Sequence, residues 1–438
     1  MAVTQIAPGS PREYGTFKDC ARAPIHGWFQ YPAGYSYKLV EAKARQYGLD
    51  SGSWALDPFV GCGTTSVALK QMGINSIGID SHPFVFWVAQ VKTYWEYDMV
   101  SLEEAIKHLW AKLTSEIDSG GLQKVDTSAL PELLHKCYSP ENLARLLLIR
   151  EAISRLDTDS HISDFIRLAL TATLRLAAKA GTGWPYIAPT EYHERVKERN
   201  ALEAFTTQLW RMYSDLRLVI TSTNDTGAEC ELILGDAREY HPTIESESVD
   251  LVLTSPPYLN NYDYADRTRL EMYFFGYANT WRDITLNVRE KLMMSATTQI
   301  NRSAFDEECF LDEELTQAAP AVYSELYSKV NGLKAVRCSK GGKKSYDIMV
   351  AGYFSDILKV LKQIHRVLKA GHDFVLVLGD SAPYGVYIPT EEYLGQLALG
   401  VGYSRYNVEV LRQRGGKWPG NPQRHKVKLK ESILTITK

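Results

Sequence analysis

Two short segments of the chain hold residue types that could do chemistry on a small ligand. The first is Asp57-Pro58-Phe59-Val60-Gly61-Cys62-Gly63. Its glycines allow a sharp turn and a close backbone approach to a ligand, where any Cβ would collide. A helix that starts after them would present free N–H groups to a carboxylate or phosphate. The segment lacks the Gly-x4-Gly-Lys-Ser/Thr pattern that cradles nucleoside triphosphates,. Asp80, further on, is placed to accept hydrogen bonds from a ribose diol, and together these features favour a ligand that contains adenosine,.

The second segment is Thr254-Ser255-Pro256-Pro257-Tyr258. Its two prolines stiffen the backbone and remove two N–H donors, which leaves carbonyl groups free to accept. A hydroxyl followed by such a backbone suits an exocyclic amino group, whose two N–H bonds need two acceptors. The tyrosine ring could stack on a flat base. The alternative interpretation is a rigid turn with a packed tyrosine.

The hydrophobic pattern places both segments at the ends of strands. We expect a strand at 54–56, a helix at 64–72 and a strand at 76–79, which together form half of a doubly wound parallel sheet,. The strand pattern returns at 231–234 and 249–254, where the second segment begins. A helix at 346–368 and strands at 374–378, 406–411 and 432–436 follow, and the last two are expected to close the sheet as a hairpin. The prediction is an α/β fold with a Rossmann-like, mostly parallel sheet.

Two insertions interrupt this pattern. Residues 84–229 show apolar positions at helical spacing and predict a large helical insertion,. Residues 262–345 form a second inserted region, polar and aromatic. The catalytic domain would then consist of residues 1–83, 230–261 and 346–438.

Composition narrows the class of protein. The chain has 438 residues, of which 45% are hydrophobic and 23% charged, as expected for a globular protein with an ample core,. No stretch is long and apolar enough for a membrane span, and no secretory signal is evident. The six cysteines are scattered without a CxxC pair, and the histidines show no HxH or HExxH pattern. We therefore expect reduced thiols, no metal site and a cytoplasmic location. With a net charge of −3, nucleic-acid binding would need local basic patches,.

The motifs resemble those of the DNA amino-methyltransferases, which transfer a methyl group from S-adenosyl-L-methionine to N4 of cytosine or N6 of adenine. The resemblance rests on DPFVGCGTT (57–65), IGID (77–80), LGDA (234–237), TSPPY (254–258) and RVLKAGHDFVLVLGDS (366–381). YPAGY (31–35) resembles the segment that closes over the methionine end of the cofactor, with Gly34-Tyr35 in place of the usual lysine and phenylalanine. The resemblance implies the class I methyltransferase fold.

The resemblance also implies roles for individual residues. Asp57, Phe59, Gly61 and Gly63 would cradle the methionine end of the cofactor, and the further predicted cofactor-binding residues are Tyr31, Pro58, Thr64 and Thr65. Asp80 would bind the ribose, and Asp236 and Ala237 would flank the adenine. The predicted catalytic residues, which would hold the acceptor base, are Ser255, Pro256, Pro257 and Tyr258. Cys62 is expected to be a small loop residue, because C5-cytosine methyltransferases carry their nucleophile in a Pro-Cys pair where this chain has Pro-Pro-Tyr.

The acceptor is expected to be N4 of cytosine, because serine before the two prolines resembles the cytosine-N4 enzymes. N6 of adenine is the alternative. An RNA amino-methyltransferase is a further alternative, although those enzymes usually carry Asp or Asn before the prolines. The last alternative is a non-catalytic DNA-recognition subunit. The presence of Gly61, Gly63, Asp80 and Ser255 argues against it. The expected setting is restriction-modification or phage defence, with cognate restriction or defence proteins as candidate partners.

The expected partner is double-stranded DNA. A base amine inside a duplex is out of reach, so the base would be flipped out, and cationic side chains would hold the phosphates. Two runs without acidic residues, 334–344 and 412–430, are the candidates, although such runs are often solvated loops. The predicted DNA-binding residues are Lys340, Lys343, Lys344, Arg412, Arg414, Lys417, Arg424, Lys426 and Lys428. The segment 184–199 of the helical insertion is a third candidate. The insertion 84–229 is therefore a candidate DNA-recognition region, and the region 262–345 is a candidate for DNA contact and target recognition.

Overall fold

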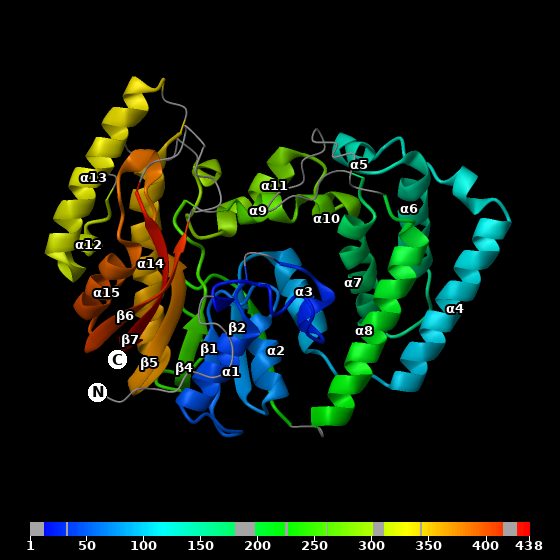
Figure 1. Cartoon of the computed structure of the whole chain (residues 1–438), viewed down its shortest axis with the longest axis horizontal. Helices are drawn as coiled ribbons and strands as arrows, with labels where there is room; N and C mark the ends of the chain where they lie inside the picture. The colour runs from blue at the N-terminus through cyan, green and yellow to red at the C-terminus, as the bar shows by residue number, and fades with distance from the viewer. Residues whose placement is uncertain are drawn as a thin grey trace.

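A computed structural model describes residues 13–31, 34–179, 198–223, 227–260, 262–300, 311–341, 344–414 and 427–438. Figure 1 shows a sheet with its covering helices on one side and a group of long helices on the other. No helix in the described ranges is both long and apolar enough to cross a membrane.

The sheet has seven strands in the order β3-β2-β1-β4-β5-β7-β6. Neighbouring strands from β3 to β5 are parallel, whereas β7 runs antiparallel to both β5 and β6. The strand bounds are β1 Trp54–Asp57, β2 Asn75–Asp80, β3 Cys230–Leu234, β4 Val249–Thr254, β5 Leu368–Gly379, β6 Arg405–Arg414 and β7 Leu429–Thr437. The predicted doubly wound, mostly parallel sheet with a closing hairpin is confirmed. The strand order reverses between β1 and β4, and a sheet of this kind binds ligands at that point.

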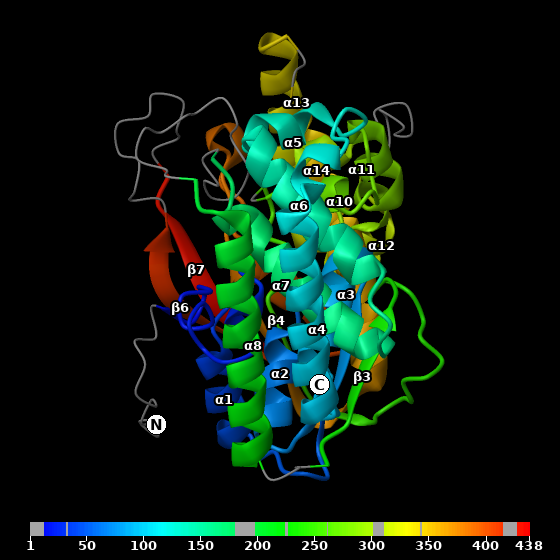
Figure 2. The ribbon, with the colours of Figure 1, turned by 90° about the vertical axis from the view of Figure 1, so that its right-hand side faces the viewer.

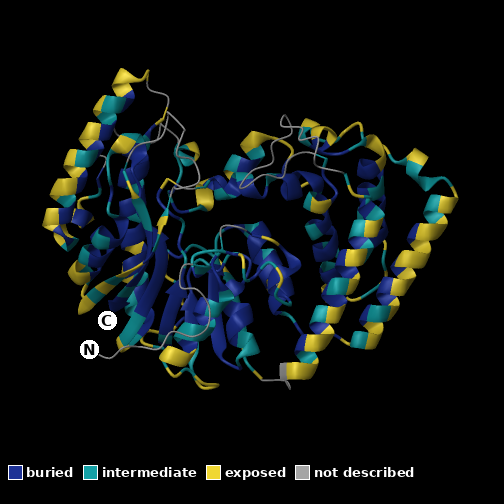
Figure 3. Ribbon diagram, viewed as in Figure 1, coloured by how far each residue is buried: buried dark blue, intermediate teal, exposed yellow. Residues whose placement is uncertain are grey.

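Alternating apolar side chains bury both faces of the sheet. Ala55, Leu251 and Val375 point to the face covered by α1 (Tyr37–Gln46) and α2 (Thr64–Gln71). Leu56 and Val252 point to the face covered by α14 (Tyr346–Val367) and α15 (Thr390–Val401). This is the two-residue period of a strand that is buried on both sides. In Figure 3 the central strands and α14 are accordingly buried along most of their length.

The structure differs from the sequence prediction at the start of β5. The strand begins at Leu368, not at residue 374, and Leu368 pairs with Val249 of β4. Gly371, which lies between the predicted helix and the predicted strand, has φ +78°, and its N–H donates to the carbonyl of Lys438. A contact with the far end of the chain therefore extends the strand.

The first predicted insertion, 84–229, begins inside helix α3 (Pro83–Thr93), which packs against β2 and β3. Beyond α3 the chain forms a group of helices around its own apolar core, and Figure 2 shows the longer ones side by side. Ser139 and Asp159 cap two of these helices by accepting from backbone N–H groups of the first turn,. The helices are α4 (Met99–Asp118), α5 (Glu132–Cys137), α6 (Pro140–Ser154), α7 (Ser160–Leu176) and α8 (Ala201–Thr223).

The second insertion divides between the two sides of the molecule. Helices α9 (Tyr264–Arg267), α10 (Arg269–Phe274) and α11 (Trp281–Asn287) extend from the end of β4 to the helical group, where α10 contacts α5 and α7. Helices α12 (Glu314–Ala318) and α13 (Pro320–Ser339) pack against α14 and α15. Short 3-10 helices occur at His26–Trp28, Gly121–Lys124, Arg289–Lys291, Thr297–Gln299 and Pro383–Gly385.

Candidate active site

The ends of three adjacent strands form a pocket. Because β1 pairs with both β2 and β4, the loops after Asp57, Asp80 and Thr254 meet at one edge of the sheet,. The pocket is lined by residues from all three loops, from the N-terminal segment and from the second insertion. These residues are Tyr31, Gly34, Tyr35, Phe59, Val60, Gly61, Cys62, Thr64, Asp80, Ser81, His82, Val85, Ser255, Pro257, Tyr264, Leu292 and Met293.

The two glycines of the first loop have different surroundings. Gly61 has φ +53°, and a Cβ built on it would meet nothing closer than 3.9 Å, at the Tyr31 ring and the Phe59 carbonyl. A side chain there would enter the pocket. Gly63 has φ +83°, and its Cβ would lie 3.3 Å from the Cβ of Ala89. Gly63 is not among the pocket residues, so it permits close packing of α2 on α3,.

Asp80 presents a carboxylate to the pocket. Its Oδ2 accepts from the Gly61 N–H at 2.8 Å, and its Oδ1 accepts from the His82 N–H at 2.8 Å. Burial raises the pKa of Asp80 to about 6. An ionised carboxylate has about four lone-pair sites, so it can accept hydroxyl groups in addition. The open cradle at Gly61 and this acceptor fit the methionine and ribose ends of S-adenosylmethionine.

The Asp57 side chain was predicted to bind the cofactor, but it does not line the pocket. Its side chain is buried, with Oδ1 accepting from the Thr254 hydroxyl at 2.6 Å and from the Phe59 N–H at 3.0 Å. The Thr65 hydroxyl donates to Oδ2, and Thr65 also bonds the Tyr35 hydroxyl at 2.6 Å. Burial raises the pKa of Asp57 to about 6. Asp57, Pro58 and Thr65 do not line the pocket, so this carboxylate joins the loops and is a positioning group.

The Ser255–Tyr258 segment contributes Ser255 and Pro257 to the pocket wall. Tyr258 is buried, and its hydroxyl donates to Glu431 at 3.2 Å. The Ser255 Oγ lies 3.4 Å from the Tyr258 hydroxyl, and the Arg414 guanidinium lies 5.3 Å from the centre of the tyrosine ring. Because the ring is buried and outside the pocket, it is not an open stacking platform in this structure.

Asp236 and Ala237 are not brought to the pocket. The Asp236 carboxylate pairs with Arg238, which also pairs with Asp356 at 2.8 Å. Ala237 is buried in the core between the sheet and α14. The Met294 N–H donates to Asp356 at 2.8 Å, which fixes the segment whose Leu292 and Met293 line the pocket.

Sequence reasoning missed several pocket residues. Tyr264, Leu292 and Met293 belong to the second insertion and carry no motif, so nothing local indicated them. His82 also lines the pocket, and it caps α3 by accepting from the Phe84 N–H at 3.3 Å. Its ring also bonds the Thr268 hydroxyl at 2.8 Å, and burial lowers its pKa to about 4. Burial raises the pKa of the Cys62 thiol and so disfavours the thiolate form that would act as a nucleophile,.

The side chains predicted to bind DNA differ in how far the protein itself already engages them. Arg412 pairs with Glu431 at 2.6 Å, and Arg414 donates to the Asp380 carbonyl at 3.2 Å. The ammonium groups of Lys340 and Lys344 lie over the rings of Tyr384 and Tyr346, at 4.7 and 5.9 Å. Lys428 is exposed. Lys343, Lys417, Arg424 and Lys426 lie outside the described residues, as does almost all of the segment 184–199.

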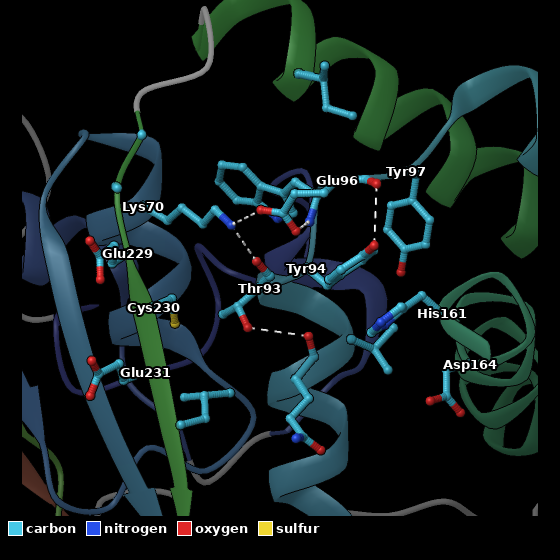
Figure 4. A pocket seen from close by; sticks show the side chains of 17 residues that line it. Lys70, Thr93, Tyr94, Glu96, Tyr97, His161, Asp164, Glu229, Cys230 and Glu231 are labelled. Carbon is cyan, nitrogen blue, oxygen red and sulfur yellow. Dashed lines mark hydrogen bonds and ion pairs between the residues drawn. The ribbon is translucent and has the colours of Figure 1, made fainter. Parts of the chain in front are cut away.

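A larger groove lies at the outer edge of the sheet, between β3 and the helical group. Figure 4 shows Lys70 bonded to the Thr93 carbonyl and to Glu96, with the Tyr94 ring against His161. Those two rings are stacked with centroids 3.8 Å apart. The groove includes none of the strand-end residues above, and its acidic side chains would repel phosphates. These are Glu96, Asp164, Glu229 and Glu231. Within the described ranges, no three His, Cys, Asp or Glu side chains are grouped as a metal site.

Comparison with known proteins agrees with this geometry. The model of the DNA methylase family N6_N4_Mtase matches residues 11–90, which include Tyr31, the glycine loop and Asp80. The chain is 24% identical over 423 residues to Type II methyltransferase M.BsoBI of Geobacillus stearothermophilus, covering 90% of this chain and 81% of the relative. It is 24% identical over 426 residues to M.AvaI of Nostoc sp., covering 91% and 83%. A shorter match, 39% identical over 82 residues, is to M.MjaII of Methanocaldococcus jannaschii, covering 19% and 15%.

The sheet order, with β7 antiparallel, is that of the class I methyltransferases, and the pocket lies where such a sheet binds its ligand,. The methyl donor of this family is S-adenosylmethionine. The family match over residues 11–90, the relatives and the strand-end pocket together support an S-adenosylmethionine-dependent DNA amino-methyltransferase.

Proposed function

We propose that the protein methylates N4 of cytosine at a specific site in double-stranded DNA. The observation that carries the proposal is the position of Ser255 in the wall of the same pocket as Gly61 and Asp80. The bond from Thr254 to Asp57 fastens the loop that would hold the base to the loop that would hold the cofactor. An acceptor base and a methyl donor would therefore meet in one pocket.

The chemistry requires an amine whose lone pair is free. The lone pair of an exocyclic amine is delocalised into the ring, so the amine is a poor nucleophile. The Ser255 hydroxyl and the Pro256 carbonyl would accept its two N–H bonds, which directs the lone pair out of the ring plane. S-adenosylmethionine, when bound, supplies an electrophilic methyl group on a sulfonium. As the N–C bond forms, the S–C bond breaks and the sulfur leaves as a neutral thioether. No strong base is needed beforehand, because the methylated nitrogen is then a cationic ammonium that is acidic enough to lose its proton to water.

A flipped base needs a surface to stack on. We predicted this role for Tyr258, but its burial and the Arg414 contact leave it better suited to holding Ser255. Tyr264 lines the pocket, and its hydroxyl accepts from the Tyr258 N–H at 3.4 Å. We assign base stacking to Tyr264.

The two insertions would hold the duplex. In Figure 1, α13 rises on one side of the strand ends and α9–α11 lie on the other. The catalytic body, 1–83, 230–261 and 346–438, would then carry the chemistry, and the regions 84–229 and 262–345 would read the target. The Type II methyltransferase names of the relatives favour a restriction-modification setting, with a cognate nuclease as a partner.

The test is to incubate the protein with unmethylated DNA and S-adenosylmethionine, digest the DNA and identify methylated nucleosides by mass spectrometry. N4-methylcytosine is expected, and an RNA substrate in a parallel reaction should stay unmodified. N6-methyladenine as the only product would overturn the base assignment and support the adenine alternative. Cofactor binding without any methylated product would support a recognition subunit.

A further inference from the structure

A buried glutamate on the last strand is linked to Ser255 through Tyr258. Glu431, in β7, is 2% exposed. Its Oε1 accepts from the Tyr258 hydroxyl at 3.2 Å, and the Ser255 hydroxyl donates to the Tyr258 hydroxyl over a longer 3.4 Å. Hydrogen bonds of catalytic groups are often long before the substrate binds. Because Ser255 lines the pocket, the three side chains form a hydrogen-bonded chain that ends there.

The charge on Glu431 fixes the direction of both hydrogen bonds. Its second oxygen, Oε2, accepts from Arg412 Nε at 2.6 Å, so Glu431 is a carboxylate that accepts and does not donate,. Burial, and then the charge on Glu431, raise the pKa of Tyr258, so the phenol keeps its proton and donates it to Glu431. With its one proton committed, Tyr258 can only accept from Ser255. The lone pairs of the Ser255 hydroxyl are left to accept from a ligand.

The surroundings of Glu431 hold the carboxylate in place. Its backbone pairs with Gly379 of β5 on one side and with Arg412 of β6 on the other. Gly15 packs so closely against the carboxylate that a side chain at that position would collide with it. The carboxylate is therefore kept away from water and cannot turn from Tyr258 without disturbing the sheet or the N-terminal segment.

We infer that Glu431 is a positioning residue that sets the Ser255 hydroxyl as an acceptor for the amine of the base. The inference rests on the proposed function, in which Ser255 accepts one of the two N–H bonds of that amine. An unrestrained serine hydroxyl can donate as well as accept, and a donating one would turn its hydrogen toward those of the amine. Glu431 removes this choice through Tyr258. Both hydroxyl groups keep their protons, so Glu431 does not act as a general base.

The experiment compares the wild type with Glu431→Gln and Tyr258→Phe. The amide of Glu431→Gln can donate to Tyr258, which lets the phenol proton turn to Ser255, and Tyr258→Phe removes the acceptor of the Ser255 proton. Each change should slow single-turnover methylation of DNA by roughly 10- to 100-fold, up to the scale of losing one oriented group. Calorimetry should show unchanged affinity for S-adenosylmethionine. Wild-type rates in both variants would overturn the inference and leave the proposed function standing.

A double variant separates positioning from a structural role. If Glu431 acts through Ser255, Glu431→Gln added to Ser255→Ala should be no slower than Ser255→Ala alone. Losses that multiply, or a loss of cofactor affinity in Glu431→Gln, would show a structural role and overturn the inference.

The matched control is Glu391→Gln. Glu391 is also buried, but its ion pair in the described part of the chain is with Lys430, at 2.7 Å. Its removal should leave the methylation rate unchanged, and a loss equal to that of Glu431→Gln would overturn the inference. Wild-type protein that yields no methylated nucleoside would overturn the proposed function as well.

Discussion

The Thr254 hydroxyl donates to the buried Asp57 carboxylate at 2.6 Å, although 197 positions separate the two residues in the sequence. Asp57 ends β1 and precedes the glycine loop, while Thr254 ends β4 and precedes Ser255. The bond therefore sets the distance between the glycine loop and the Ser255 loop, which we propose hold the cofactor and the base. Its loss should affect both stability and cofactor binding.

Thr254→Val tests this link. The change keeps the shape of the side chain but removes a donor to a buried carboxylate, which should cost about 1.5–3 kcal/mol of unfolding free energy. Urea unfolding would measure the loss, and calorimetry should show weaker cofactor binding. Thr114→Val, on the exposed side of α4, is the control and should change neither. Wild-type stability and affinity in Thr254→Val would contradict the role of the bond.

Asp57 and Asp80 predict an unusual dependence of stability on pH. Their pKa values are raised to about 6, mainly by burial, whereas the pKa of an aspartate in the unfolded chain is about 3.9,. Between these values the folded state binds more protons than the unfolded state. The contribution of these two groups to stability therefore falls as pH rises from about 4 to about 6 and is level above that.

Urea midpoints across this range, in wild type and in Asp80→Asn, would test the dependence. The variant should show a smaller fall, since one of the two groups no longer titrates. Cofactor affinity should rise through about pH 6 in the wild type, because ribose hydroxyls donate to an ionised Asp80. Identical pH profiles of the two proteins would refute the assignment.

Ser255→Ala should separate catalysis from cofactor binding. Ser255 lines the pocket, and the one side-chain hydrogen bond described for its hydroxyl is the long one to Tyr258, so folding should be little affected. Loss of one oriented acceptor should lower turnover roughly 10²-fold or more, while the affinity for S-adenosylmethionine stays the same. Single-turnover methylation assays and calorimetry would measure the two quantities. A variant with wild-type turnover would remove Ser255 from the mechanism.

Gly61→Val should abolish cofactor binding. The Cβ has room, so the effect would come from filling the pocket, together with strain at φ +53°,. Gly48→Val is a matched control, because Gly48 has φ +63°, open space around it and no place in the pocket. Both variants should lose similar stability, and only Gly61→Val should lose the cofactor. Equal cofactor affinity in both variants would contradict the site.

Lys428→Ala tests phosphate contact by the C-terminal basic run, in which Lys428 is exposed. Binding should weaken for all DNA sequences alike, and the log–log salt slope should fall by about one. Lys18→Ala, outside both basic runs, should leave the slope unchanged. An unchanged slope in Lys428→Ala would show that the run is a solvated loop.

The sequence alone determined the sheet, the glycine loop and the candidate pocket loops. These depend on local requirements: alternating apolar residues for buried strands, positive φ at Gly61 and Gly63, and donor-free backbone at the two prolines. Strand order then places the loops together, because β1 lies between β2 and β4. The motif residues Gly61, Asp80 and Ser255 could therefore be predicted without coordinates.

Only the tertiary structure decided which of the expected side chains face the pocket. The Asp57 carboxylate accepts hydrogen bonds from the hydroxyl groups of Thr254 and Thr65. Asp236 pairs with Arg238, which also pairs with Asp356. Tyr264 and Met293 reach the site because the second insertion folds back over the strand ends. These contacts join residues far apart in the chain. Which partner a buried carboxylate bonds depends on the groups that folding brings next to it, and no local sequence pattern records that.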